Sequence, residues 1–380
     1  MNSSSSPARC RISVLAGIAF VALFLLPRPG LAQAKTQRPP RLSGAPHVFV
    51  QHIRIYGPSL AGNLEGEKVN RPAIVFLPPS YFKDKTRRYP VVYALHGFFI
   101  NAEKWTHEIH VPLTIANAYA RGARQMIVVL PDSYTLYGGS MYSDSETTGN
   151  FERYVYHDVV HYMDTHYRTI PNRLARGLVG HSMGGYGALR IGMQHPGVFG
   201  SLYVMSACCL SPMMAGGPRP PLAPGGKRPP SLRQMLRGIA SPAEAARKLP
   251  WFVKMQLALA AAWSPDPAKP PLFLDLPFQN GKPVPAVQAE WAANSPLAMI
   301  GQYIYNLRRY RAIGLDVGDQ DGLRFDMIKV HHILDRYHIR NHFQIYHGTH
   351  TSHVAYRFQN HVLPFFSRHL CFAAPCRARR

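Results

Sequence analysis

Acidic residues are scarce in this chain of 380 residues. It carries 20 Asp and Glu against 43 Lys and Arg, and its formal net charge is +23. Such a balance favours association with anionic lipid, polysaccharide or nucleic acid. The basic residues are scattered, except in the basic tail at 371–380, and no nucleic-acid-binding motif accompanies them. The sequence therefore indicates no specific nucleic-acid partner and leaves two explanations of the charge open, electrostatic association with anionic envelope surfaces and the high pI of a secreted protein without such a partner.

Cysteine is also rare, with five residues and no CxxC spacing, which excludes a zinc ribbon. Cys208 and Cys209 are adjacent in an apolar run. We expect buried thiols there, because a disulfide between neighbours is strained. Cys371 and Cys376 could close a small loop in an oxidising compartment, and the sequence leaves that bond open.

A metal-binding signature is missing as well, although the chain has 19 histidines. His157 and His161 are spaced i, i+4 on a predicted helix, but no HExxH motif and no carboxylate or Cys cluster completes a site. We therefore predict no metal and no organic cofactor.

The chain shows no apolar run of the length that a membrane span requires, which is about 20 residues. The run at 12–26 has 15 residues, follows Arg9 and Arg11, and precedes an Ala-x-Ala pattern at 32–34. This order is typical of a cleavable signal peptide, and an uncleaved anchor is the alternative. We expect residues 1–34 to be removed and the mature protein to be secreted or periplasmic.

After a linker at 35–46, short apolar runs alternate with helical patterns over 47–370. The runs are bounded by Pro or Gly, as buried strands are. Strands that alternate with helices favour a doubly wound, mostly parallel sheet in a single α/β domain. The predicted strands are 48–56 at an edge, then 73–77, 91–95, 125–130, 178–180, 202–206, 313–317 and 343–346; the predicted helices are 150–168, 185–195 and 362–370.

About a hundred residues, 211–310, interrupt this alternation. Residues 211–230 are rich in Pro and Gly, and helical patterns follow at 231–249 and 251–263. An insertion of this size on an α/β sheet usually caps the site. The alternative is a surface elaboration without a catalytic role.

The stretch GHSMG at 180–184 matches the pattern G-x-S-x-G between a predicted strand and a predicted helix. Small neighbours let a nucleophile occupy a strained strand-to-helix turn, where its hydroxyl is exposed at the positive end of the helix. Ser182 is therefore a candidate nucleophile.

A serine nucleophile needs a base and an acid that orients the base. After a turn of this kind the acid precedes the histidine in the chain. The end of one later strand supplies Asp316, Asp319 and Asp321, and the end of the next supplies His347, His350 and His353.

An oxyanion site requires two backbone N–H groups. His96-Gly97 ends a predicted strand, so Phe98 can provide one N–H, and Met183 can provide the other. In the loop after the strand at 125–130, Asp132, Tyr137 and Tyr142 either line the cleft or have a plain loop role.

These motifs together resemble the esterase D-like serine esterases of the α/β-hydrolase superfamily. The group includes S-formylglutathione hydrolases, feruloyl esterases and secreted mycolyltransferases. The resemblance covers residues 48–210 and 300–370 and rests on VVYALHG, GHSMGGYGALRIGMQHPGVFG, LDVGDQDGL and VLPFFSRHL. It implies an α/β-hydrolase fold.

The resemblance also implies roles for single residues. Ser182 matches the nucleophile, Asp321 the acid of a G-x-x-D turn, and His350 the base of a Gly-x-His turn. The oxyanion N–H groups map to Phe98 and Met183.

Asp319 remains an alternative acid and His353 an alternative base, while His347 is expected to be structural. Two positions depart from the family pattern, and the second departure bears on the substrate more than on the chemistry. Thr349 stands where many relatives have Asp before the histidine, and two phenylalanines follow Gly97 where many have a glycine.

The predicted function is a secreted serine esterase that hydrolyses a small-molecule, polysaccharide or lipid ester through an acyl-enzyme. One alternative is an acyltransferase to a sugar or lipid hydroxyl that uses the same three residues. The other is a non-catalytic binder of envelope polymer.

Overall fold

The computed structural model describes residues 38–212, 232–279 and 281–376. The predicted signal peptide, most of the Pro/Gly-rich stretch 211–230 and the last residues of the basic tail lie outside this range. Among the described helices, none has the length and apolar composition needed to cross a membrane.

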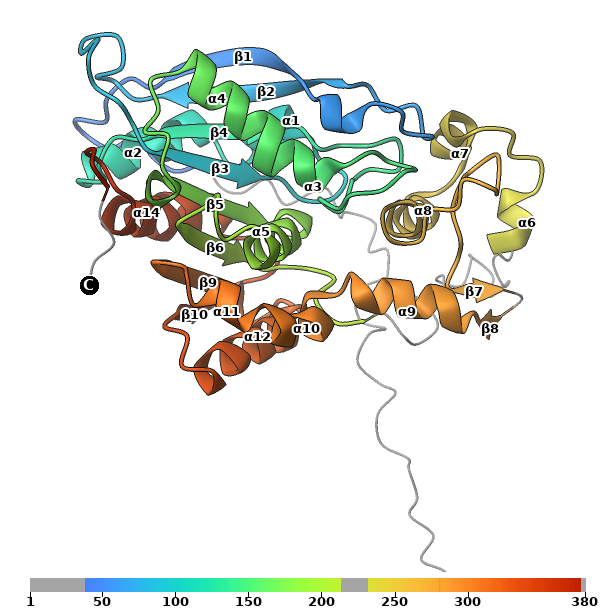
Figure 1. Ribbon diagram of the computed structural model, residues 1–380. Coiled ribbons are helices and arrows are strands. Elements are labelled where there is room, and N and C mark those ends of the chain that lie inside the picture. Colours follow the sequence, from blue (N-terminus) through green and yellow to red (C-terminus); the bar gives the residue numbers. More distant parts are fainter. Residues whose placement is uncertain (1–37, 213–231, 280, 377–380) are drawn as a thin grey trace, which may run out of the picture.

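An eight-stranded sheet forms the centre of the molecule, in the order β1-β2-β4-β3-β5-β6-β9-β10 (Figure 1). β1 and β2 pair antiparallel, as do β2 and β4, and all the other pairs are parallel. The predicted mostly parallel sheet is thereby confirmed. The strands are β1 Phe49–Tyr56, β2 Asn70–Leu77, β3 Val91–Leu95, β4 Ile127–Pro131, β5 Arg176–His181, β6 Ser201–Met205, β9 Ala312–Gly318 and β10 His342–Tyr346.

Burial explains why these segments are strands. Every residue of β3, β4, β6 and β9 is buried, as expected for parallel strands covered on both faces. β1 alternates between exposed and less exposed residues, which agrees with its predicted place at an edge. β10 forms the other edge and is largely open to solvent.

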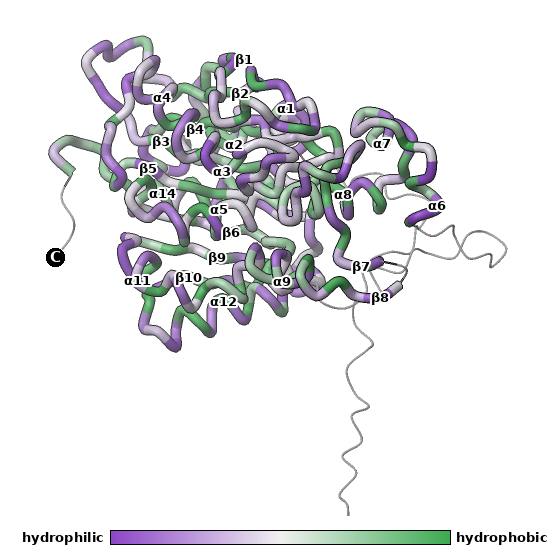
Figure 2. Tube along the Cα trace, turned by 45° about the vertical axis from the view of Figure 1, so that its right-hand side comes forward, coloured by the Kyte–Doolittle hydropathy of each residue, from purple (hydrophilic) through white to green (hydrophobic). Residues whose placement is uncertain are grey.

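Helices cover both faces of the sheet, and each layer encloses its own apolar core (Figures 1 and 2). One layer contains α3 Phe151–Arg153, α4 Val160–His166, α5 Met183–Gln194, α11 Ile304–Leu307 and α12 Arg324–Arg336. The other contains α1 Ala102–Glu108, α2 Val111–Ala120, α13 Val354–Arg357 and α14 Leu363–His369. Alternate residues of β3 enter opposite cores, with Tyr93 in one and Val92 in the other.

Some predicted helices are divided. The helix expected at 150–168 contains a π-helical segment, Tyr154–Val159, between α3 and α4. The pattern at 231–249 becomes two helices, α6 Leu232–Leu236 and α7 Pro242–Lys248. Gly238, with φ of +75°, and the proline at the start of α7 separate them.

Most of the described part of the insertion lies beyond the carboxyl ends of the parallel strands (Figure 1), while its last helix, α11, lies in the layer that contains α5. The part beyond the strand ends comprises α6, α7, α8 Trp251–Trp263, the hairpin of β7 Phe278–Gln279 and β8 Lys282–Pro283, α9 Pro285–Ala293 and α10 Pro296–Met299. Its buried side chains join the core on the α5 side. Hydrogen bonds fasten it there, among them those from Tyr186 Oη to the carbonyl of Asn294 (2.7 Å) and from Trp263 Nε1 to Ser143 Oγ (3.3 Å).

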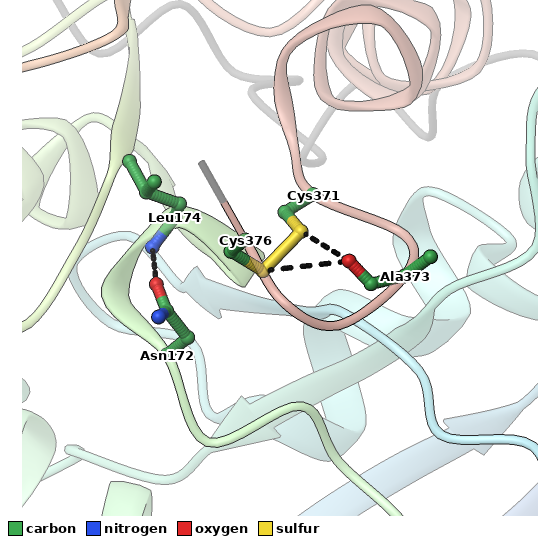
Figure 3. Close-up of a disulfide and its surroundings, with 5 residues drawn as sticks. All are labelled: Asn172, Leu174, Cys371, Ala373 and Cys376. Carbon is green, nitrogen blue, oxygen red and sulfur yellow. Dashed lines mark hydrogen bonds between the residues drawn. A yellow bond between two sulfur atoms is a disulfide. The ribbon is translucent and has the colours of Figure 1, made fainter. Parts of the chain in front are cut away.

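Cys371 and Cys376 form a disulfide, with their Cα atoms 5.8 Å apart (Figure 3). The bridge closes the loop after α14, and the Cys371 N–H donates to the carbonyl of Leu174 (2.8 Å). Cys208 and Cys209 are free thiols, as expected, but they are half-buried and not fully buried.

Candidate active site

Ser182 occupies the junction between β5 and α5. Its backbone has φ 60° and ψ −117°, an unfavourable conformation for a residue with a side chain. The Ser182 N–H donates to the carbonyl of Met205 at 3.0 Å, and the Tyr186 N–H donates to the Ser182 carbonyl at 3.0 Å. Neighbouring strand and helix thus hold the serine in a sharp turn.

Two glycines make this turn sterically possible. A Cβ on Gly180 would lie 2.0 Å from the Gly184 carbonyl oxygen, and a Cβ on Gly184 would lie 2.0 Å from the Leu95 carbonyl oxygen. The two glycines of the turn lie so close to each other's backbone and to the backbone of β3 that no side chain fits at either position. This close packing explains the G-x-S-x-G pattern.

The three residues matched by the resemblance lie in one hydrogen-bonded series. His350 Nε2 is 3.0 Å from Ser182 Oγ, and His350 Nδ1 is 2.8 Å from Asp321 Oδ2. The second oxygen of Asp321 accepts the Leu323 N–H at 3.0 Å. Residues more than 130 positions apart in the chain meet because β5, β9 and β10 end at the same edge of the sheet.

The Asp321 side chain is fully buried. Burial raises the pKa of its carboxyl, but the hydrogen bond and charge of His350 and the Leu323 N–H together lower that pKa below its usual value. Asp321 is therefore a carboxylate at neutral pH, and it accepts a hydrogen bond from the protonated Nδ1 of His350.

Among the described residues, the alternative acid and the alternative base share no hydrogen bond, and Asp319 pairs with His347 instead. Asp319 contacts His347 Nδ1 at 3.0 Å and accepts the Gly348 N–H at 2.9 Å. The His347 side chain is 82% exposed, so this pair braces the turn at the surface. His353 lies at the start of α13, against Tyr346. In the part of the chain that the structure describes, the Ser182 hydroxyl is within hydrogen-bond distance of His350 and of neither His347 nor His353.

A cavity of about 140 Å³ opens beside Ser182. Its lining is mostly apolar and comes from the loop after β3, from α1 and from the loop before α13. It comprises Gly97, Phe98, Ile100, Trp105, Glu108, Ile109, His181, Ser182, His350, Thr351 and Val354. An acyl or alcohol group of a substrate would fit against these side chains.

Of the two predicted oxyanion donors, Phe98 lines this cavity, and Met183 directly follows Ser182, which also lines it. Within residues 38–212, 232–279 and 281–376, no residue accepts a hydrogen bond from the N–H of Phe98 or Met183. Met183 is also the first residue of α5, where the helix dipole favours negative charge. In the described ranges, neither N–H group is therefore used by a backbone hydrogen bond of the turn.

Buried polar groups support the loop that carries Phe98. The Ser133 N–H donates to His96 Nε2 at 2.9 Å, so Nδ1 carries the proton and donates to the Gly97 carbonyl at 2.9 Å. Burial lowers the pKa of His96 and keeps its ring neutral. Tyr142 Oη also donates to the His96 carbonyl at 3.0 Å.

The other loop candidates have supporting roles and do not line the cavity. Asp132 is buried and forms an ion pair with Arg71 at 3.0 Å. Tyr137 is fully buried. The sequence predicted neither Arg71 nor most of the cavity lining, which includes His181 and the α1 residues Trp105 and Glu108. The only signal for His181 was its place directly before the serine.

His181 sits under the ring of His350, with the ring centroids 4.7 Å apart. Its Nε2–H donates to the His350 carbonyl at 2.8 Å. Burial, and then the proximity of His350, lower the pKa of His181 to about 3. This neutral ring fixes the backbone of His350 without adding a charge beside it.

Possible metal ligands do not gather anywhere in the described residues. His157, one of the two spaced histidines, instead contacts Asp158 at 2.9 Å.

A mostly parallel α/β sheet that presents a serine on a strained strand-to-helix turn defines the α/β-hydrolase class. Solved structures support this fold. A ferulic acid esterase has a TM-score of 0.58 and 22% identity, covering 85% of this chain and 98% of its own. An S-formylglutathione hydrolase from Agrobacterium tumefaciens has a TM-score of 0.52 and 15% identity, covering 86% and 96%. A ferulic acid esterase from Anaeromyces mucronatus has a TM-score of 0.52 and 18% identity, covering 86% and 94%.

Sequence comparison identifies the family. The model of the Esterase family, described as "Putative esterase", matches residues 67–371. The chain therefore belongs to the Esterase family, a family of carboxylic-ester hydrolases. An endo-1,4-beta-xylanase/feruloyl esterase from Xylanibacter ruminicola is 29% identical over 133 residues, which are 34% of this chain. The chain aligns to only 18% of that relative's length.

Proposed function

We propose that this chain is an exported serine esterase in which Ser182 is the nucleophile, His350 the base and Asp321 the acid that orients the base. The observation that carries the proposal is the hydrogen-bonded series from Ser182 Oγ to His350 Nε2 (3.0 Å) and from His350 Nδ1 to Asp321 Oδ2 (2.8 Å). These distances lie in the range needed for proton transfer between a nucleophile and its base.

In the proposed reaction, Ser182 Oγ attacks the ester carbonyl while His350 Nε2 takes the hydroxyl proton. The carbonyl oxygen becomes an oxyanion, which the N–H groups of Phe98 and Met183 stabilise. His350 then gives its proton to the leaving alcohol, and Ser182 remains acylated. Water attacks the acyl-enzyme in the same way and releases the acid.

Asp321 stabilises the charged imidazolium that forms in each step. Its buried carboxylate keeps the Nδ1 proton in place, so Nε2 is the nitrogen that exchanges protons. The neutral His181 adjacent to His350 does not oppose this positive charge.

The substrate we propose is a carboxylic ester whose acyl group enters the apolar cavity beside Phe98. The likeness to feruloyl esterases supports an aryl-substituted acyl group as the first to test. The Arg-preceded apolar run at 12–26 supports export. The net charge of +23 falls only by the three arginines of residues 1–34 on their removal, and the remaining positive charge supports association with anionic envelope polymers.

Hydrolysis of p-nitrophenyl acetate, butyrate, octanoate and ferulate tests the chemistry. We expect turnover by the wild type, and no turnover by Ser182→Ala at an unchanged melting temperature. Labelling with a fluorophosphonate should likewise require Ser182. Turnover that survives in Ser182→Ala would contradict the assignment.

Two further measurements test the rest of the proposal. Product analysis with an added alcohol acceptor separates hydrolysis from acyl transfer, because transfer yields a new ester. Amino-terminal sequencing of the protein recovered outside the cytoplasm should begin near residue 35. A protein retained in the cytoplasm at full length would refute export.

A further inference from the structure

Cys208 and Cys209 are neighbouring free thiols directly after β6. Their Sγ atoms lie 3.1 Å apart, and both residues are half-buried. Within the described ranges they are the only free cysteines, and the proposed mechanism uses neither. Cys209 has φ of +58°, a conformation that side chains rarely adopt.

The backbone beside this pair supports the nucleophile. The Cys208 N–H donates to the Ser182 carbonyl at 3.2 Å, and the Ser182 N–H donates to the Met205 carbonyl at 3.0 Å. Just beyond the pair, the Leu210 carbonyl accepts the Leu297 N–H of α10 at 2.9 Å. A change of the Cys208–Cys209 peptide would therefore reach both the Ser182 turn and the insertion.

We propose that Cys208 and Cys209 form a redox modification site, at which oxidation to a vicinal disulfide displaces the Ser182 turn and lowers esterase activity. The oxidant is a small disulfide such as oxidised glutathione. The Cys208 thiolate attacks one sulfur of the oxidant, and a first thiol leaves. The Cys209 thiolate then attacks the Cys208 sulfur and releases a second thiol. The two cysteine protons end on the two released thiols, so atoms and electrons balance.

Geometry explains why this bond would disturb the turn. Neighbouring Cα atoms are about 3.8 Å apart across a trans peptide, whereas disulfides usually join Cα atoms about 4.4–6.8 Å apart. The sulfurs must approach from 3.1 Å to about 2.05 Å, so the intervening peptide has to twist. The Cys208 N–H lies in the preceding peptide, Ala207–Cys208, so a rotation about the Cys208 backbone transmits the change to Ser182. The same strain makes the disulfide easy to reduce, so the modification is reversible.

The experiment equilibrates the purified full chain with mixtures of oxidised and reduced glutathione. Peptide mass mapping follows the fragment that contains both cysteines, while hydrolysis of p-nitrophenyl butyrate follows activity. We expect this fragment to become lighter by two hydrogen atoms. In parallel, kcat/KM should fall roughly ten- to a hundredfold, the size expected when a nucleophile is misplaced but present. Dithiothreitol should reverse both changes.

The control is the double variant Cys208→Ala/Cys209→Ala, whose activity should not respond to the oxidant. A fragment that keeps its mass under fully oxidising conditions, or that gains a glutathione, would overturn the site. An unchanged kcat/KM in the oxidised protein, or a fall that persists in the double variant, would overturn the coupling to Ser182. The activity readout rests on the proposed function, but the fragment mass does not, so failures of the two ideas are distinguishable.

Discussion

Replacing Asp321 by Asn gives a sharp test of the acid that orients His350. Asp321 uses both of its oxygens, one for His350 Nδ1 at 2.8 Å and one for the Leu323 N–H at 3.0 Å. An Asn side chain has a single acceptor oxygen and an NH₂ group that only donates. The Leu323 N–H is part of the backbone and cannot turn away, so it takes the oxygen. The NH₂ group of the variant is then left facing His350.

This arrangement forces the wrong tautomer on the imidazole. Facing a donor, His350 Nδ1 must accept a hydrogen bond, so the ring proton moves to Nε2. Nε2 then donates to Ser182 Oγ and can no longer take its proton. We expect kcat to fall roughly ten-thousandfold, the loss known for this tautomer error, which corresponds to about 5.5 kcal/mol in the barrier. KM should change little.

Asp319→Asn is the matched control, two residues away in the same turn. Its partner His347 is 82% exposed, and exposed ion pairs contribute about 0.2–1 kcal/mol. The expected loss in kcat is therefore within about fivefold. Steady-state hydrolysis of p-nitrophenyl butyrate measures both variants. Similar losses in the two, or an Asp321→Asn enzyme within tenfold of wild type, would refute the assignment.

Three other predictions follow from single contacts. His181 has a pKa of about 3 when folded and about 6.5 when unfolded, so below pH 6.5 the unfolded state binds more protons and stability falls as the pH drops towards 3. Urea unfolding measures the fall in the free energy of unfolding between pH 7 and pH 4, and this fall should be about 3 kcal/mol smaller in His181→Asn than in the wild type. An equal fall in the wild type and the variant would contradict the prediction. Gly184→Ala places a Cβ 2.0 Å from the Leu95 carbonyl oxygen, so circular dichroism should show a protein that fails to fold or melts far lower; a native melting temperature would be the contrary result. Phe98→Ala keeps the backbone N–H but enlarges the cavity, so kcat/KM should gain roughly fourfold per added acyl methylene beyond the wild-type optimum. Phe99→Ala is the control, because Phe99 does not line the cavity. If Phe99→Ala shifted the preferred acyl chain length as much as Phe98→Ala does, the acyl site would lie elsewhere.

The sheet was predictable from sequence because its buried strands are continuous apolar runs. β3 agrees with the predicted segment, and the other strands differ by a few residues at their ends. The helices α1, α2 and α12 were not predicted. In α12, only Met327, Val330 and Leu334 are buried, and the rest of the helix mixes acidic, basic and histidine residues with other apolar ones, so the buried stripe is narrow. That stripe becomes apparent only once the sheet provides the surface that it covers.

The site was predictable to the extent that its constraints are local. The strained turn at Ser182 requires glycines within two residues on either side, so it leaves a mark in the sequence. The supporting contacts leave none. His96 meets Ser133 across 37 positions, and His181 meets His350 across 169. No spacing rule relates such residues, because the topology of the sheet sets their distance.

The choice between Asp319 and Asp321 shows what the fold adds to the sequence. Both carboxylates follow β9, and each contacts a histidine of the loop after β10. Burial separates them, since Asp321 is fully enclosed whereas Asp319 is 45% exposed. A charge in a low-dielectric site polarises its partner strongly, while solvent screens the exposed pair. Only the enclosed carboxylate can stabilise a transient imidazolium by several kcal/mol, and for this reason the two Asn variants must differ in rate by orders of magnitude.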